Sequence, residues 1–141
     1  MNDDPLYAKP LLRLAAVATG AGRLSNPDAT GEAFNPACGD RLSVTFTLDT
    51  GGRITALAHE TKACVLTQAS ASILGAHLKG AGANDVRKLR DQIAAMLEGG
   101  APPPPPFADY ATLAAAANYP GRHTCVLLPI DAVLSALKHG A

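Results

Sequence analysis

Hydrophobic and polar residues alternate along residues 41–48, where every second side chain is apolar: Leu42, Val44, Phe46 and Leu48. This alternation is typical of a β-strand with one buried face. Turn-forming residues 49–52 follow, and residues 53–60 alternate again, so the pattern predicts an antiparallel hairpin. Residues 29–35 are predicted to form a shorter strand that ends before Pro36, because proline interrupts the pairing of strands.

Other segments have apolar residues at the three-to-four-residue spacing of an amphipathic helix. They lie at residues 5–17, 64–79, 85–97, 107–117 and 125–138. Asn84 is in position to cap the third of these helices, and Pro129 is expected in the first turn of the last one. Residues 99–106 include five consecutive prolines, which predict a stiff extended connector. The order of elements predicts an α+β fold, in which a small antiparallel β-sheet of about three strands packs against several helices.

Composition narrows the functional classes. The chain has 141 residues, which fits a single domain covering residues 1–141. With 48% hydrophobic residues and no tryptophan, the core is expected to be aliphatic and rich in alanine. The formal net charge is zero and no basic run occurs, so we expect neither nucleic acid nor a membrane as a partner. The acidic start, the lack of an apolar run of about 20 residues and the odd number of cysteines indicate a cytoplasmic protein with reduced thiols.

The candidate chemistry lies in three cysteines that are far apart in the sequence: Cys38, Cys64 and Cys125. Asp40 follows Cys38 after a single glycine, which lets the backbone turn so that both side chains face one metal ion. Cys64 and Cys125 stand where helices are predicted to begin, and a helix start favours the thiolate form. Three thiolates and one carboxylate are enough for a tetrahedral metal site. Because no C-x-x-C pair is present, spacing alone leaves open that these are three unrelated buried cysteines.

The local sequence around each cysteine favours the shared site. Residues 35–40, NPACGD, resemble the N-P-x-C-G-D signature of iron–sulfur cluster assembly scaffolds, the IscU/SufU/NifU N-terminal family. Residues 64–72, CVLTQASAS, are similar to the second cysteine of that family and the small-residue helix start after it. Residues 122–128, RHTCVLL, resemble the third cysteine, with a basic residue shortly before it. The resemblance extends from about Pro5 to Leu137.

Departures from the IscU branch place the chain nearer the SufU branch. Thr124 stands where the IscU branch has a histidine directly before its third cysteine. Residues 117–122 do not have the chaperone-recognition pattern of the IscU branch. The stretch at residues 99–106 lies where the SufU branch carries an insertion. Both branches have the α+β order of elements that the hydrophobic pattern predicts.

The resemblance implies a site, a cargo and partners. Cys38, Asp40, Cys64 and Cys125 would bind either a [2Fe–2S] cluster or Zn²⁺, and Asp40 would be the weakest and most exchangeable ligand. Cys125 would take sulfur as a persulfide from a cysteine desulfurase of the SufS/IscS type. Apo iron–sulfur proteins would accept the finished cluster. The protein would then be a scaffold or sulfur acceptor, and not an enzyme in the sense of turnover.

Two alternatives remain beside the scaffold: a zinc-dependent sulfurtransferase and a structural zinc domain, which differ in whether the metal exchanges and a cysteine accepts sulfur. A cysteine-nucleophile enzyme is disfavoured, because no Cys–His pair occurs in a familiar context. Some neighbouring residues have two interpretations. His123 is either a spare ligand or proton donor, or an exposed turn residue. Arg41 either orients Asp40 or is a solvated charge, and Lys62 either stabilises the Cys64 thiolate or is simply exposed.

Overall fold

A three-stranded antiparallel sheet forms one layer of the computed structural model, which describes residues 8–37 and 39–140. The strands are β1 (Ala29–Asn35), β2 (Asp40–Leu48) and β3 (Ile54–Lys62), in the spatial order β1-β2-β3. All three predicted strands are present, and the predicted hairpin joins β2 to β3. The register pairs Asn35 with Asp40 at one end of the β1–β2 hairpin.

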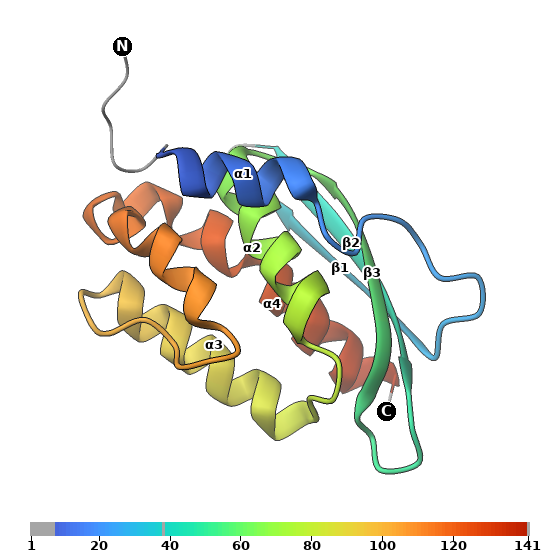
Figure 1. Cartoon of the computed structure of the whole chain (residues 1–141). Helices are drawn as coiled ribbons and strands as arrows, with labels where there is room; N and C mark the ends of the chain where they lie inside the picture. Colours follow the sequence, from blue (N-terminus) through green and yellow to red (C-terminus); the bar gives the residue numbers. More distant parts are fainter. Residues whose placement is uncertain (1–7, 38, 141) are drawn as a thin grey trace.

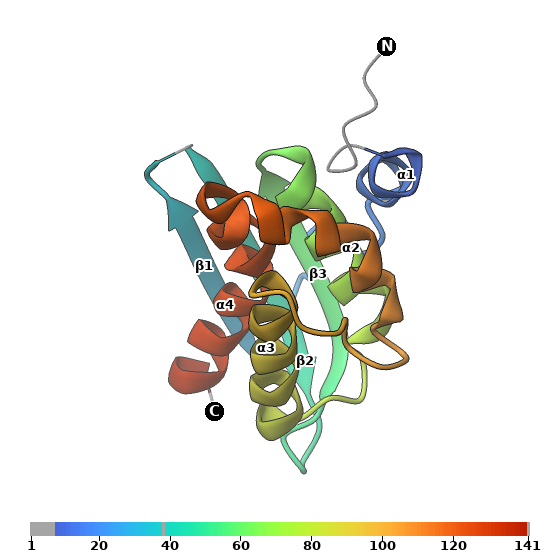
Figure 2. The same cartoon turned by 90° about the vertical axis from the view of Figure 1, so that its left-hand side faces the viewer.

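The helices lie together on one face of this sheet (Figures 1 and 2). They are α1 (Lys9–Val17), α2 (Val65–His77), α3 (Ala83–Leu97) and α4 (His123–Gly140), with two 3₁₀ helices, η2 (Ala108–Asn118) and η3 (Pro120–Arg122). Helix α4 packs against β1 and β2, and α2 packs between α1 and α4. This arrangement confirms the predicted α+β class. Among the described residues, no helix combines the length and apolar character needed to cross a membrane.

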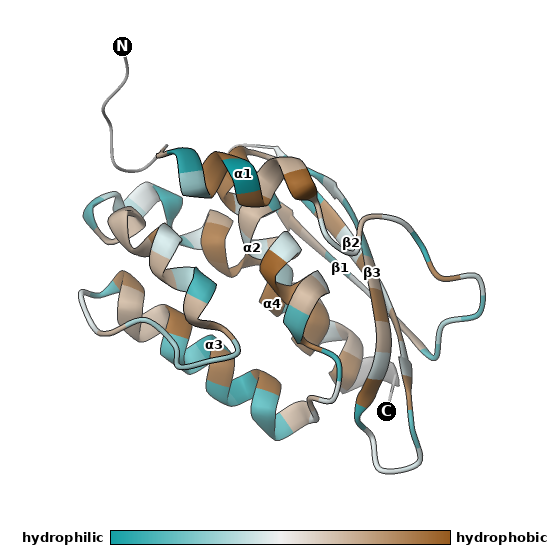
Figure 3. Cartoon of the chain, viewed as in Figure 1, coloured by the Kyte–Doolittle hydropathy of each residue, from teal (hydrophilic) through white to brown (hydrophobic). Residues whose placement is uncertain are grey.

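Alternating hydropathy explains which side of each element faces the core. In β2, the side chains of Leu42, Val44 and Phe46 are buried, as the alternation predicted. Helix α3 shows hydrophilic residues interspersed with hydrophobic ones (Figure 3), and its buried side chains recur at helical spacing: Val86, Leu89, Ile93, Met96 and Leu97. Burial of these apolar side chains is the main contribution that stabilises the packing of helices on the sheet.

Helix α4 approaches β1 through a glycine. A Cβ atom built on Gly31 would overlap with the carbonyl oxygen of Ala132 and would crowd the Cβ atom of Ala136. Gly31 therefore lets the helix backbone contact the strand directly, a distance that a larger residue does not permit. Since α4 also carries Cys125, this close contact fixes the position of one candidate ligand relative to the sheet.

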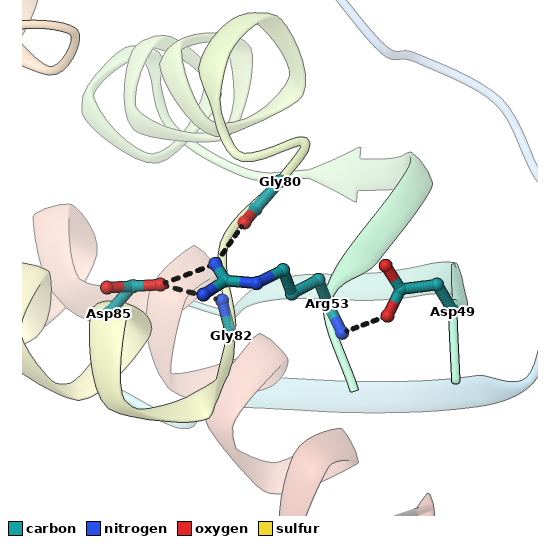
Figure 4. Close-up of polar contacts among 5 residues, drawn as sticks. All are labelled: Asp49, Arg53, Gly80, Gly82 and Asp85. Atoms are coloured by element: carbon teal, nitrogen blue, oxygen red, sulfur yellow. Dashed lines mark hydrogen bonds and ion pairs between the residues drawn. The ribbon is translucent and has the colours of Figure 1, made fainter. Parts of the chain in front are cut away.

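Arg53 connects the hairpin turn to the segment between α2 and α3 (Figure 4). Its backbone N–H donates to Asp49 Oδ1 at 2.9 Å, and its guanidinium donates to the carbonyl oxygen of Gly80 at 2.9 Å. The guanidinium also lies 3.5 Å from Asp85 Oδ2, and that carboxylate accepts the N–H of Gly82 at 2.9 Å. These contacts secure the end of the sheet that lies opposite the candidate site.

Three details of the predicted helices are wrong. The third helix begins at Ala83 with Gly82 as its N-cap, so Asn84 does not cap it; Asp85 accepts the N–H of Gly82 instead. Helix α4 begins at His123, before the predicted start, so that Pro129 lies in its interior and not in its first turn. The alanine-rich helix is 3₁₀ and not α-helical, and residues 5–7 of the first predicted helix fall outside the described residues.

Candidate metal centre

Asp40, Cys64 and Cys125 come together at one end of the sheet. One carboxylate oxygen and the two sulfur atoms all lie within 4.8 Å of one another. Asp40 is the first residue of β2, Cys64 is the N-cap of α2, and Cys125 lies in the first turn of α4. Three segments that are distant in sequence thus place three donor atoms around one point. The fourth predicted ligand, Cys38, lies outside the described residues.

The hairpin between β1 and β2 positions Asp40. The N–H of Gly39 donates to the carbonyl oxygen of Asn35 at 2.8 Å, and Asn35 Oδ1 accepts the N–H of Ala37 at 3.1 Å. Gly39 has φ +76°, a left-handed conformation that glycine adopts without steric cost. The turn brings Asp40 opposite Asn35 in the register, with its side chain buried.

Cys64 is held against Asp40 by its own backbone. Its N–H donates to Asp40 Oδ1 at 3.0 Å, which fixes the start of α2 to the start of β2. The residue has extended backbone angles, φ −65° and ψ 167°, as an N-cap requires. Cys64 is half-buried, so its sulfur is the more accessible of the two described candidate thiols.

Cys125 is almost fully buried, with 1% of its surface exposed. Because α4 begins at His123, two residues before the predicted start, Cys125 lies inside the first turn and not at its first position. The first turn of a helix still presents the positive end of the helix dipole. The burial of Cys125 also means that its sulfur faces other parts of the protein and not open solvent.

Thr67 joins these three segments, and sequence reasoning missed it. Its hydroxyl oxygen lies 3.0 Å from Asp40 Oδ2, 2.9 Å from the carbonyl oxygen of Cys125 and 3.6 Å from Cys64 Sγ. The residue is fully buried. Two features of the sequence could have pointed to Thr67. It lies one helical turn after Cys64, and Pro129 lies four residues after Cys125. Neither signal reveals a contact between α2 and α4 before the packing is known.

A second hydroxyl on α2, that of Ser70, attaches α2 to α4 beside the site. Ser70 Oγ donates to the carbonyl oxygen of Val126 at 2.8 Å and lies 2.7 Å from the hydroxyl of Tyr110. Burial raises the pKa of the Tyr110 phenol well above its usual value, so the hydroxyl keeps its proton at neutral pH. The first turn of α4 is therefore tied to α2 next to Cys125, independently of any metal.

The contacts of His123, Arg41 and Lys62 show which of their two interpretations fits the structure. His123 points toward the carbonyl oxygen of Ala117, 3.3 Å away, and toward Glu98, 3.8 Å away. His123 is half-buried, so it is not an exposed turn residue. It is also not one of the residues whose donor atoms cluster at the site. The guanidinium of Arg41 lies 5.4 Å from the ring centre of Phe34. Lys62 is exposed, in agreement with the simpler interpretation.

The chemistry of the donor atoms fits a thiophilic metal or cluster. Sulfur and carboxylate oxygen are the donors that zinc and iron–sulfur sites use. In a tetrahedral site with metal–sulfur bonds of about 2.3 Å, two sulfur ligands lie about 3.8 Å apart. The observed limit of 4.8 Å means that the three side chains need only a small contraction to bind one ion. Asp40, Cys64 and Cys125 would supply three of its ligands, and Cys38, two residues before Asp40 in the sequence, is the predicted fourth.

Comparison with known proteins shows the family of the chain. A family model described as the NifU-like N-terminal domain matches residues 6–126. The chain is 35% identical, with a TM-score of 0.90, to the N-terminal part of a nitrogen-fixing NifU-like protein from Brucella abortus, over 96% of this chain and 94% of that one. A search of curated proteins gave no match.

The fold is also that of a SufU protein. This second structure, from Fervidobacterium islandicum AW-1, is described as an iron–sulfur cluster assembly scaffold for the SUF system. It is 22% identical, with a TM-score of 0.86, over 96% of this chain and 99% of that one. The matches to a NifU-like and a SufU structure agree with the resemblance of residues 35–40, 64–72 and 122–128 to the scaffold family. The chain belongs to the NifU-like N-terminal domain family.

Proposed function

We propose that this protein takes part in the assembly of iron–sulfur clusters and binds iron and sulfide, as a [2Fe–2S] cluster, through Cys38, Asp40, Cys64 and Cys125. The observation that carries the proposal is the convergence of Asp40, Cys64 and Cys125 from three distant segments onto one point. Membership of a family that includes cluster assembly scaffolds supports it. The cluster is cargo: it is built on the protein and then passed to an apo iron–sulfur protein.

The mixed ligand set suits a site that must release what it holds. Thiolates bind iron strongly, whereas a carboxylate is a harder ligand that matches the soft cluster less well. We therefore expect the bond between the Asp40 carboxylate and iron to open first during transfer. The half-buried position of Cys64 gives an incoming protein access to one edge of the site, while Cys125 stays covered.

Sulfur delivery is the second part of the proposal. A cysteine desulfurase of the SufS/IscS type would carry a persulfide, and a thiolate of the scaffold would take its terminal sulfur. Cys125 is the acceptor that the family resemblance implies. Because Cys125 is 1% exposed, it can accept sulfur from outside only when the packing around the first turn of α4 opens. We propose that these steps take place in the cytoplasm, with neither nucleic acid nor a membrane as a partner.

Zinc is the alternative occupant, and one observation favours it. Two sulfur atoms and one carboxylate oxygen lie within 4.8 Å of one another, and one further thiolate would complete a closed tetrahedral zinc site. With zinc bound, the protein would act as a sulfurtransferase that receives persulfide sulfur, or the metal would only stabilise the fold. The two zinc functions differ in whether sulfur is transferred to a cysteine.

Elemental analysis of protein purified without air separates these functions. Iron and acid-labile sulfide in equal amounts support the scaffold. About one zinc per chain without sulfide supports the sulfurtransferase or the structural domain, which incubation with a desulfurase and cysteine then distinguishes by the mass of a persulfide. A Cys64→Ser, Cys125→Ser double variant is the matched control. If the native protein retains no metal even after reconstitution, the cysteines are ordinary buried residues and the proposal fails.

A further inference from the structure

Thr67 lies where the three segments of the candidate metal centre meet, and its side chain is fully buried. We propose that Thr67 is a positioning residue of this centre. Its hydroxyl holds Asp40 in the ligand position while the site is empty, and turns to the carbonyl oxygen of Cys125 once Asp40 bonds to a metal. This inference rests on the proposed function, because it requires Asp40 to be a ligand.

The hydroxyl of Thr67 has two acceptors and only one proton. Asp40 Oδ2 lies 3.0 Å from Thr67 Oγ1, and the carbonyl oxygen of Cys125 lies 2.9 Å from it. A hydroxyl donates one hydrogen bond, so the two acceptors compete for it. Since both distances are already short, rotation of the hydroxyl hydrogen is enough to move the hydrogen bond from one acceptor to the other. The oxygen itself does not need to move.

In the empty site, Thr67 completes the orientation of the Asp40 carboxylate. Asp40 Oδ1 accepts the N–H of Cys64 at 3.0 Å, and Oδ2 faces Thr67. A donor on each oxygen fixes the plane of the carboxylate, which otherwise rotates freely about its terminal bond. A ligand held in the right orientation loses less conformational entropy when the metal binds. Thr67 should therefore increase the affinity of the site for its metal.

A bound metal changes which of the two acceptors forms the stronger hydrogen bond with the Thr67 hydroxyl. The ion withdraws negative charge from the Asp40 carboxylate, so its oxygen becomes a weaker acceptor. The buried hydroxyl must still donate a hydrogen bond, because leaving it unsatisfied is costly. The carbonyl oxygen of Cys125 is the acceptor within reach. Pro129 has no N–H to donate to that carbonyl along the helix, which makes the carbonyl available to Thr67.

The test compares Thr67→Val, which removes the hydroxyl at nearly constant shape, with Thr67→Ser, which keeps it. Zn²⁺ affinity is measured by competition with a chromogenic chelator. We expect Thr67→Val to bind Zn²⁺ about 10- to 100-fold more weakly, as is typical when a group that orients a metal ligand is lost. Thr67→Ser should stay within a few-fold of the native protein. Ser70→Ala is the matched control, because Ser70 also attaches α4 to α2 but does so at the carbonyl oxygen of Val126.

A second measurement needs no metal. Hydrogen exchange of the Cys64 amide reports whether Asp40 Oδ1 still accepts it, and we expect exchange up to about tenfold faster in Thr67→Val only. The proposal is overturned if Thr67→Val binds Zn²⁺ within twofold of the native protein, or if Thr67→Ser or Ser70→Ala loses as much affinity as Thr67→Val. If the native protein binds neither Zn²⁺ nor, after reconstitution, iron, the proposed function fails, and amide exchange still decides whether Thr67 orients Asp40.

Discussion

Pro129 lies four residues after Cys125 in α4, the spacing at which a helix normally closes its backbone hydrogen bond. Proline has no N–H, so the carbonyl oxygen of Cys125 accepts a hydrogen bond from the Thr67 hydroxyl of α2 instead, at 2.9 Å. The next carbonyl, of Val126, also accepts a hydroxyl of α2, that of Ser70. The proline that interrupts α4 thus coincides with the place where α2 is attached to it, directly beside the candidate ligand.

This relationship predicts an energetic coupling between Thr67 and Pro129. With Zn²⁺ bound, when the Thr67 hydroxyl donates to the Cys125 carbonyl, Thr67→Val should lower the free energy of unfolding by about 1–3 kcal/mol, because that buried acceptor loses its donor. In a Pro129→Ala background the loss should be smaller, because the new N–H of residue 129 can donate to the Cys125 carbonyl. Urea unfolding of the four proteins in this double-mutant cycle measures the difference. Additive effects, within about 0.5 kcal/mol, would show that the two residues are independent.

Cys64→Ser and Cys125→Ser should each weaken metal binding strongly, because each removes a sulfur donor from the group that lies within 4.8 Å. His123→Gln should leave the affinity nearly unchanged, since His123 contacts Ala117 and Glu98 and not the donor atoms. Isothermal titration with Zn²⁺ under reducing conditions measures all three. Unchanged affinity in both cysteine variants would count against a shared site, and a large loss in His123→Gln would restore the histidine as a ligand.

The thiols should differ in their accessibility. In the metal-free protein we expect iodoacetamide to modify half-buried Cys64 about tenfold or more faster than Cys125, whose reaction must wait for local opening. Peptide mass spectrometry over a time course follows each residue separately. In concentrated urea, where the packing is lost, the two rates should become similar. Faster labelling of Cys125 in the folded protein would mean that the first turn of α4 opens readily.

His59 should make stability depend on pH. It is buried in β3, and its Nε2 donates to the carbonyl oxygen of Thr19 while Nδ1 lies 2.9 Å from the hydroxyl of Thr61. Burial lowers the pKa of His59 below its usual 6.5, although the hydrogen bond to Thr19 opposes the shift. The unfolded chain therefore binds the proton more readily, so the stabilisation is complete above pH 6.5 and is lost as the pH falls below it.

Urea unfolding between pH 8 and about pH 5 checks this for the native protein and for His59→Gln. The variant lacks the ring that titrates, so its free energy of unfolding should fall less steeply in the acidic range. The remaining histidines are common to both proteins, and their contribution cancels in the difference. Parallel pH profiles would mean that burial of His59 does not disfavour its protonation.

Gly31→Ala should disturb both stability and the metal centre. The new methyl group would overlap with the carbonyl oxygen of Ala132, so α4 must shift away from β1. We expect a loss of about 1–3 kcal/mol in the free energy of unfolding, and weaker Zn²⁺ binding because Cys125 moves with the helix. Gly121→Ala is the control: nothing lies within 4 Å of its added Cβ atom, so it should be neutral or slightly stabilising. Equal behaviour of the two variants would refute the close contact.

The sequence predicted the helices and strands better than the contacts between them. The strict alternation of β2 identified the hairpin, because one buried face repeats every two residues. Asp40, Cys64 and Cys125 were found because cysteine and carboxylate carry recognisable chemistry, and the structure brings these three together. Their role as ligands, like the single-domain organisation and the part of Cys38, stays a prediction.

The errors share a physical cause. Pro129 was expected in the first turn of α4 because proline is costly inside a helix. That cost is reduced here by the Thr67 hydroxyl of α2, which replaces the one donor that Pro129 cannot supply. Thr67 was overlooked for the same reason: a polar residue on a buried helix face is explained only by its tertiary partners. Local propensity contains no information about such contacts between distant segments.

Because α4 is the last helix in the chain, its position determines when the proposed site becomes complete during synthesis. A ribosome extends the protein from its N-terminus, so Asp40 and Cys64 are synthesised long before Cys125. Until α4 emerges, the nascent chain lacks one proposed ligand and also the helix that packs on β1 through Gly31. Under the proposed function, a half-made chain therefore lacks the complete site. Cluster loading would then follow translation of the last helix.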